Sequence, residues 1–202
     1  MNVYDPSPAD FPMAIAPRTE LRAAHPDFAD ELFALTSCNA DRLARWLPWV
    51  RATRTADDTR AFLSFARQQF AEGKQVHCVI FVDGRAAGVV GINKIDRIDL
   101  RCEFGYWIAE EFAGRGIVTE AVRAFTDFAF TRLALHRCEV HCAEPNTRSA
   151  RVAERAGYVL DALLKEAIRV YEPEEFVNRR IYRLLRGEWE QLRGRSHAGA
   201  PG

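Results

Sequence analysis

The fold of this chain is decided by one stretch, Glu103-Phe-Gly-Tyr-Trp-Ile-Ala-Glu-Glu-Phe-Ala-Gly-Arg-Gly-Ile-Val-Thr-Glu-Ala121. In its first part successive side chains alternate between two faces, with Glu103 and Trp107 on the same one, which predicts a strand over 100–109. Its last part opens a segment, 117–133, whose apolar residues recur at helical spacing. The sequence therefore predicts a strand that passes through a short glycine loop directly into a helix.

The loop between this strand and this helix contains Gly114-Arg115-Gly116. The first N–H groups of a helix have no intrahelical partners, and together with the helix dipole they attract an anion. Glycines let the backbone approach a phosphate closely, because no Cβ intervenes. The same pattern also fits an ordinary strand-to-helix turn. The loop is not a dinucleotide-binding fingerprint, because the third glycine is missing. It is not a P-loop either, because the Gly-Lys-Ser/Thr sequence is missing.

Outward from this stretch, the pattern predicts helices before the sheet and alternating elements after it. The expected elements before the loop are a strand at 19–24, helices from 26 and within 39–50, a helix capped by Asp57 or Asp58, and a hairpin of strands 75–82 and 85–95. The expected elements after the helix are strand 137–143, helix 146–156, and strand candidates 158–160, 165–171 and 176–185. This order predicts an α/β or α+β fold with a mixed sheet.

The length of 202 residues favours one domain with short tails. Residues 1–18 are rich in Pro, Asp and Ala, and we expect an irregular extension there. Residues 19–189 are expected to form the domain. The polar segment 190–202 is predicted to be a disordered tail.

Composition narrows the function classes. Basic and acidic residues number 28 each, which argues against a protein that coats nucleic acid. No apolar run is long enough for a membrane span, and the first residues do not resemble a signal peptide. The five cysteines lack a secreted framework, so a cytoplasmic protein with reduced thiols is expected. His136 and His141 near Cys142 lack a zinc spacing, so no metal site is predicted.

The decisive stretch resembles the acyl-CoA-binding motif of the GNAT superfamily of N-acetyltransferases, Gln/Arg-x-x-Gly-x-Gly/Ala. Its amino-acid sequence is most similar to that of the RimJ/RimL-type branch, the ribosomal-protein serine/alanine N-acetyltransferases. A second block, Asn146-Thr-Arg-Ser149 followed by Gly157-Tyr158, resembles that branch's Asn-x-x-Ser and Gly-Phe. Further agreement comes from Leu21-Arg22, the Trp46-Leu-Pro-Trp49 box and residues 88–95, so the resemblance covers about 19–189.

Three positions depart from the family pattern. Ala113 stands where the family has Gln or Arg, and Val118 stands where it has Gly or Ala. Ile168 stands where some members of the branch place their catalytic base, and Glu166 is the nearest acid. Phosphate binding through backbone N–H groups is expected to survive the first two changes, with Arg115 partly replacing the lost side chain.

The resemblance implies a single GNAT domain with a mixed sheet whose central strands splay apart, one ending near Ala109 and the other starting near Arg137. Acetyl-CoA is the implied cosubstrate and lies in that opening. The implied reaction is direct acetyl transfer to a primary amine, first of all a protein N-terminal amine. A small amine such as an aminoglycoside or a polyamine remains the close alternative. An acyl-CoA-binding regulatory module without turnover, motivated by the three departures, remains the other.

The resemblance also implies the roles of individual residues. Glu103 is the expected general base, and its alternative is a structural carboxylate held by Arg101. Ser149 is expected to protonate or hydrogen-bond the sulfur of CoA, and its alternative is a helix-capping serine. The residues expected at the cofactor are Trp107, Ile108, Gly114, Arg115, Gly116, Ile117, Val118, Thr119, Asn146 and Arg151, with Arg148 as a further phosphate candidate.

The remaining expectations concern the acceptor side and the partners. Trp46 and Trp49 are expected to line the acceptor cleft, with a role as core anchors as the alternative. No membrane and no direct nucleic-acid partner are expected, and a homodimer is left open.

Overall fold

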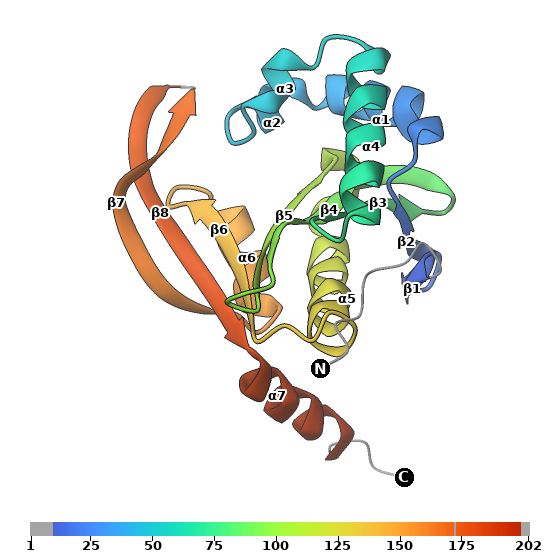
Figure 1. Cartoon of the computed structure of the whole chain (residues 1–202). Coiled ribbons are helices and arrows are strands. Elements are labelled where there is room, and N and C mark those ends of the chain that lie inside the picture. Colours follow the sequence, from blue (N-terminus) through green and yellow to red (C-terminus); the bar gives the residue numbers. More distant parts are fainter. Residues whose placement is uncertain (1–9, 172, 199–202) are drawn as a thin grey trace.

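The computed structural model describes residues 10–171 and 173–198, which form one eight-stranded sheet with helices on both faces (Figure 1). The strands are β1 (Met13–Ala16), β2 (Thr19–Ala23), β3 (Val76–Val82), β4 (Arg85–Asp96), β5 (Arg101–Ile108), β6 (Arg137–Ala143), β7 (Val159–Tyr171) and β8 (Glu174–Leu185). Their order in the sheet is β1-β2-β3-β4-β5-β6-β8-β7. Every neighbouring pair is antiparallel except β5 and β6, so the predicted mixed sheet is confirmed.

The helices separate into two groups along the chain. The first group is the 3-10 turn η2 (Pro26–Phe28), α1 (Ala29–Cys38), α2 (Ala40–Ala44), α3 (Trp49–Ala52) and α4 (Ala56–Ala71). The second group is the turn η3 (Glu110–Phe112), α5 (Ile117–Thr131), α6 (Thr147–Arg155) and α7 (Arg186–Ala198). The first group covers one face of the sheet, whereas α5 and α6 lie against the other.

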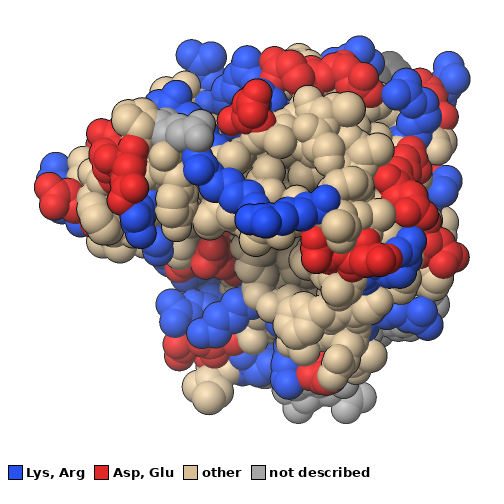
Figure 2. Space-filling model, turned by 90° about the horizontal axis from the view of Figure 1, so that it is seen from above, with Lys and Arg blue, Asp and Glu red and all other residues tan. Residues whose placement is uncertain are grey.

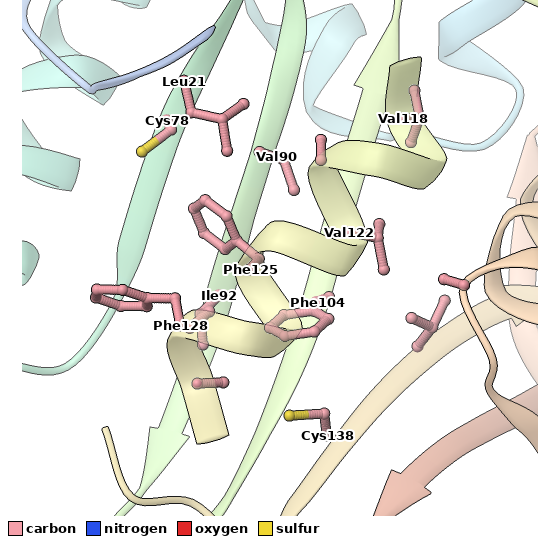
Figure 3. Packing of buried hydrophobic residues seen from close by; sticks show 14 of the residues in the cluster. Leu21, Cys78, Val90, Ile92, Phe104, Val118, Val122, Phe125, Phe128 and Cys138 are labelled. Carbon is pink, nitrogen blue, oxygen red and sulfur yellow. The ribbon is translucent and has the colours of Figure 1, made fainter. Parts of the chain in front are cut away.

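Helix α5 anchors the larger part of the core (Figure 3). Its side chains Val118, Val122, Phe125 and Phe128 point toward the sheet, as the helical spacing of the sequence predicted. They meet residues from five strands, namely Leu21, Cys78, Val90, Ile92, Phe104 and Cys138. Phe125 is fully buried, and its ring lies 6.3 Å from that of Phe104 in an edge-to-face arrangement. The helix that follows the glycine loop is therefore held rigidly by its own apolar stripe.

A smaller core lies on the opposite face, between the sheet and helices α1 and α4. Leu32, Leu63 and Ala66 pack there against Val79 and Trp107. Helix α4 begins earlier than predicted, because the side chain of Thr55 accepts a hydrogen bond from the N–H of Asp58 and caps the helix. Asp58 returns the bond to the N–H of Thr55, which completes a capping box. Asp58 thus closes the cap from within the helix, and the prediction that Asp57 or Asp58 is the capping residue was wrong.

Strands β5 and β6 are hydrogen-bonded only along their first residues. Their parallel pairing runs from Arg101 opposite Arg137 to Phe104 opposite Val140 and then stops. Beyond that point β5 continues to Ile108 beside β4, while β6 continues to Ala143 beside β8. The splayed central strands expected from the sequence are therefore present.

The closeness of β4 and β5 explains one glycine of the hairpin. A Cβ on Gly88 would lie 2.2 Å from the carbonyl oxygen of Trp107, so no larger residue fits without moving the backbone. The end of β5, just before the glycine loop, is consequently pressed against β4 and cannot drift into the opening.

The two ends of the chain differ from the sequence prediction. Within the predicted irregular extension, Met13–Ala16 forms strand β1 against β2, because Phe11 is buried beside α5 and fixes this segment. Helix α7 (Arg186–Ala198) runs from the end of the predicted domain into the predicted disordered tail, and its Trp189 is buried against Phe130. Residues 1–9 and 199–202 lie outside the described residues. The exact boundaries of the domain stay a prediction.

The last two strands form a long hairpin that rises on one side of the molecule (Figure 1). The sequence predicted two separate strands at 158–160 and 165–171, but β7 is continuous from Val159 to Tyr171. Its register shifts twice, between Leu160 and Ala162 and between Leu164 and Ile168. These bulges interrupt the alternation of side chains, which is why the pattern looked like two short strands.

Candidate active site

The loop between β5 and α5 is built around two left-handed glycines. Gly114 has φ 76° and Gly116, the N-cap of α5, has φ 79°, a region that non-glycine residues avoid. No side chain caps α5 at this end, and the first turn therefore directs the N–H groups of residues 117–119 outward. An added Cβ would meet nothing within 4 Å at either glycine, so open space surrounds this helix end. The geometry suits a phosphate group, with the helix dipole favouring the negative charge.

Other loop residues take different positions around this helix end. Thr119 and Val118 are buried, while Arg115 is exposed and stacks over the ring of Phe112 at 5.7 Å. Val118 belongs to the core cluster, so the departure from the family's small residue is absorbed inside the protein. Arg151 is exposed on α6.

The backbone of β5 offers one unpaired edge to the opening. Ala109 donates its N–H to the carbonyl oxygen of Ala87 on β4, with an N–O distance of 2.8 Å. Because backbone groups of alternate strand residues point to opposite edges, Trp107 faces β4 and Ile108 faces the opening. The carbonyl oxygen of Ile108 accepts a hydrogen bond from a guanidinium nitrogen of Arg42. The N–H of Ile108 points to the same side as its carbonyl, toward the space between β5 and β6.

On the α1–α4 face, at the point where the two strands separate, one histidine lies between two glutamates. Nδ1 of His141 is 3.5 Å from Oε2 of Glu103, and its Nε2 is 2.7 Å from Oε2 of Glu139. The side chains of His141 and Glu139 are only 17% and 12% exposed, whereas that of Glu103 is 41% exposed. Glu103 is thus the most solvent-exposed side chain of the three.

The alternative reading of Glu103, a carboxylate held by Arg101, has no counterpart in the geometry. Arg101 instead makes ion pairs with Asp96 and Asp99, each at 3.6 Å. Glu139 is the carboxylate bound by an arginine, because it accepts a hydrogen bond from Nε of Arg137. Burial raises the pKa of Glu139, but the hydrogen bonds from Arg137 and His141 outweigh it and hold the pKa below its ordinary value.

On the opposite face, α6 brings Ser149 to the edge of the same opening. Asn146 caps α6 by accepting a hydrogen bond from the N–H of Ser149 at 3.2 Å, so its capping role is present. The hydroxyl groups of Ser149 and Tyr106 are 3.0 Å apart, and that of Tyr106 also donates to the carbonyl of Ser149. Burial raises the pKa of Tyr106 and of the neighbouring Cys142 thiol. The Tyr106 hydroxyl and the Cys142 thiol therefore stay protonated.

A cluster that the sequence reading missed ties the end of β5 to the helices on either side. The N–H of Glu110 donates to Oδ1 of Asn39 at 2.9 Å, and Nε of Arg42 lies 3.0 Å from the Glu110 carboxylate. Arg148, a candidate phosphate ligand, instead donates to the same carboxylate at 2.9 Å. The hydrogen bond from Arg148 lowers the pKa of Glu110. Glu110 thus bridges α2 and α6 across the open end between β5 and β6.

Aromatic rings lie on the face of β5 that carries Trp107. Trp49 is 41% exposed, and its ring lies 6.3 Å from that of the buried Trp107. Trp46 is half-buried under the guanidinium of Arg45, at 4.7 Å. Arg51 of α3 reaches the ring of Tyr171 at the far end of β7, 5.8 Å away. Seen from above, the surface is hollowed between the β7–β8 side and the helices (Figure 2).

The two residues at the alternative base position lie away from this group. Ile168 is paired with Val177 of β8, and Glu166 sits in the bulge just before it with φ 46°. Glu166 is exposed, and its N–H donates to the side chain of Asn178. A regular strand would place Glu166 and Ile168 on the same face. The strand is irregular at Glu166, so this expectation does not apply.

Two features are absent from the described residues, a cluster of metal ligands and a membrane-spanning helix. Within 10–171 and 173–198, no group of three or more His, Cys, Asp or Glu side chains is arranged to hold a metal ion. In the same part of the chain, no helix combines the length and the apolar character that a membrane span needs.

Four of the site's polar residues were not predicted from the sequence, for different reasons. His141 was considered only as a metal ligand, although its alternation with Glu139 on one strand face was visible. Tyr106 was given no role. Asn39 and Arg42 carry no local signal, because they meet Glu110 only through tertiary packing.

Comparison with known proteins gives a consistent answer. The family model described as an acetyltransferase (GNAT) domain matches residues 18–159. The putative ribosomal N-acetyltransferase YdaF of Bacillus subtilis (strain 168) is 31% identical over 171 residues, which cover 84% of this chain and 92% of that protein. The ribosomal-protein-serine acetyltransferase of Escherichia coli (strain K12) is 28% identical over 148 residues, covering 73% and 83%.

A solved structure agrees with these relatives. RimL, a ribosomal L7/L12 alpha-N-protein acetyltransferase in complex with coenzyme A, superposes with a TM-score of 0.81 at 25% identity, covering 85% of this chain and 96% of that one. The family model spans more than half of the chain, and its match includes β5, the glycine loop, α5, β6 and α6. The resemblance read from the sequence is confirmed, and the chain belongs to the GNAT family of acetyltransferases.

Proposed function

We propose that this protein transfers the acetyl group of acetyl-CoA to the N-terminal amine of a protein. The observation that carries the proposal is the placement of Glu103 and Ser149 on opposite faces of the sheet at one opening. Glu103 shares its face with Trp107 and the acceptor side, whereas Ser149 lies with Tyr106 on the side of α5 and α6. A proton acceptor for the amine and a proton donor for the sulfur thus flank the same gap.

The residues around the gap fit acetyl-CoA. The N–H groups at the start of α5 suit its pyrophosphate, and the two left-handed glycines leave open space beside them. The N–H of Ile108, on the stretch of β5 beyond its pairing with β6, would meet the thioester or the pantetheine arm. When bound, acetyl-CoA supplies an activated acyl carbon. The remaining loop residues, Arg115 and Thr119, and the capping residue Asn146 belong to the same proposed binding surface, as does Arg151.

Two residues have proposed roles in proton movement. Glu103 is the first acceptor that the ammonium of the incoming amine meets, and the ammonium must lose a proton because a protonated amine has no free electron pair. Ser149, backed by the hydroxyl of Tyr106, donates a hydrogen bond to the sulfur. Both steps use only side chains of β5 and α6.

A protein N-terminus is proposed as the acceptor because of the relatives. The E. coli relative is named a ribosomal-protein-serine acetyltransferase, and RimL acts on the alpha-amine of ribosomal L7/L12. A spermidine N(1)-acetyltransferase of E. coli is also similar, at 28% identity, but only over 43% of this chain. The exposed ring of Trp49, which lies near the ring of Trp107, belongs to the proposed acceptor cleft, as does Trp46.

A CoA-release assay with matched acceptors tests this proposal. The panel pairs a peptide that begins with a free serine or alanine with the same peptide blocked at its N-terminus and carrying an internal lysine. Spermidine and an aminoglycoside complete it. Turnover of the free peptide alone is the expected result.

Two outcomes would contradict the proposal. Turnover of spermidine or the aminoglycoside in preference to every peptide would make the protein a small-amine acetyltransferase. Acetyl-CoA binding in a calorimetric titration without turnover of any amine would make it a binding module. Ser149→Ala, which keeps the helix N-cap at Asn146, serves as the variant that lowers turnover without abolishing cofactor binding.

A further inference from the structure

His141 occupies the point at which β5 and β6 part, and its ring is held from both sides. The neighbouring Glu139 lies two residues back on the same face of β6, and Glu103 faces it from β5. With 17% of its side chain exposed, the imidazole is mostly enclosed, yet it touches the one carboxylate that opens toward the acceptor side. Nothing in the fold requires a histidine here, because its cross-strand partner on β8 is Ile181.

The hydrogen-bond pattern decides which ring nitrogen of the neutral imidazole carries the proton. The carboxylate of Glu139 only accepts hydrogen bonds, so the 2.7 Å contact requires a hydrogen on Nε2 of His141. A neutral ring then has a lone pair at Nδ1. That lone pair faces the carboxylate oxygen Oε2 of Glu103 at 3.5 Å. In the neutral ring, two acceptors therefore face each other, and a proton that arrives at Nδ1 would be shared between them.

We propose that His141 is the second proton acceptor of the acetyl transfer: the ammonium of the acceptor donates to both Glu103 and Nδ1 of His141, and its proton ends on Nδ1. This inference rests on the proposed function. The imidazolium so formed donates to Glu103 through Nδ1 and to Glu139 through Nε2. Two carboxylates thus stabilise the positive charge at the moment when the amine becomes neutral.

The groups around the ring keep this arrangement in place. Glu139 is oriented by Arg137, which also donates to Asp161 of β7 at 2.8 Å. Arg183 of β8 lies 3.5 Å from Asp161 and is paired with Glu188. The other charged residues on the neighbouring strands are Lys94 of β4, opposite Glu103, and Arg179 of β8, which donates to the carbonyl of Ala167. Arg137 and Arg183 are thus both engaged by carboxylates, and neither stands between His141 and the acceptor.

The proton balance of the step is simple. One N–H bond of the ammonium breaks and one Nδ1–H bond forms on His141. The electron pair left on nitrogen forms the C–N bond, and the C–S bond breaks with its pair going to sulfur. The nitrogen sheds a second proton as it becomes an amide and the thiolate sulfur takes up one proton, so these two cancel in the balance of the reaction. The net proton of the reaction is the one on His141, which passes to solvent through Glu103.

A first experiment examines the ring itself, without any acceptor. Long-range ¹H–¹⁵N correlation spectra of the ¹⁵N-labelled protein report the tautomer of each histidine, and His141→Gln assigns the signal. We expect the Nε2–H tautomer of His141 in the wild type and a mixture of both tautomers in Glu139→Leu. A wild-type ring protonated on Nδ1 would overturn the proposal, because no acceptor site would then face Glu103.

A second experiment measures pH–rate profiles. His141→Gln is expected to lower kcat/KM by roughly 10²-fold and to move the acid limb to lower pH, because the carboxylate alone then takes the proton. Glu103→Gln is expected to lower kcat/KM but to keep an acid limb, since His141 remains. The control is His136→Gln, whose side chain is exposed just before β6 and should leave the profile unchanged.

The contrary results are equally specific. A lower rate in His141→Gln with an acid limb of unchanged position would mean that the histidine only shapes the site. Loss of the acid limb in Glu103→Gln, with His141→Gln active, would make Glu103 the sole base. If no amine is acetylated by the wild type, the proposed function fails, and the tautomer measurement still decides whether Nδ1 is open to a proton.

Discussion

The two faces of strand β6 show how one short strand serves two purposes. Cys138, Val140 and Cys142 point to the α5 side and are buried among aromatic and aliphatic residues. The alternate residues Glu139 and His141 point to the other side, where they are also well covered but bound to charged partners.

The difference between these faces shows where the protein is fixed and where it can react. On the α5 side, dispersion and burial hold the glycine loop and the start of α5 in place. On the acceptor side, a chain of carboxylates, arginines and one histidine replaces a second apolar layer. Buried charged groups add little net stability, and their presence at a strand separation therefore points to chemistry.

The largest expected effect breaks the packed face. Phe125→Ala should destabilise the protein by about 3–5 kcal/mol, because the fully buried ring leaves a cavity beneath α5. The matched control is Phe65→Ala on α4, where the ring is 51% exposed and the loss should be small. Chemical denaturation measures both, and equal losses would contradict the assignment of α5 as the core anchor.

The next effect tests the open space at the glycine loop. Gly116→Asn keeps a residue that tolerates φ near 79°, so the fold should persist while a side chain enters the proposed phosphate site. We expect acetyl-CoA affinity to fall by about tenfold or more, the loss of one hydrogen bond to a charged group. The control is Gly187→Ala on α7, which meets nothing within 4 Å. An unchanged Kd in calorimetry for Gly116→Asn would remove this loop from the cofactor site.

A smaller effect asks on which side Val118 lies. Val118→Ala should lower the free energy of unfolding by about 1–2.5 kcal/mol, because the side chain belongs to the core cluster. Acetyl-CoA affinity should stay the same. A variant with unchanged melting temperature and tighter acetyl-CoA binding would place Val118 at the cofactor.

The smallest expected effect concerns Glu139, on the charged face of β6. The pKa of Glu139 in the folded protein lies below its ordinary 4.5, so the ionised group stabilises the fold above that pH and loses this contribution as pH falls through the folded value. In Glu139→Gln this part of the pH dependence should be absent. Melting temperatures between pH 3 and pH 7 measure it, and parallel curves for the two proteins would show that Glu139 carries no such linkage.

The strand, the glycine loop and the amphipathic helix after it were predictable, because period-two and helical patterns are local properties of a sequence. The mixed sheet and the family followed from them. Helix α7 and strand β1 were not predictable, because each is held by one buried aromatic, Trp189 or Phe11, whose partners lie far along the chain. The cap of α4 was misplaced by a few residues, since Thr55 and Asp58 cap it jointly.

The sequence by itself determined the order of elements, the glycine loop before α5, and Glu103 and Ser149 as candidate residues for a proposed acetyl-CoA site. Only the tertiary structure decided that β5 and β6 part after Phe104 and Val140, and that His141 lies between Glu103 and Glu139 at that point. The physical reason is that periodicity reports which face a residue takes within its own strand. Which charges meet across two strands depends on their register, and register is fixed by the packing of the whole sheet.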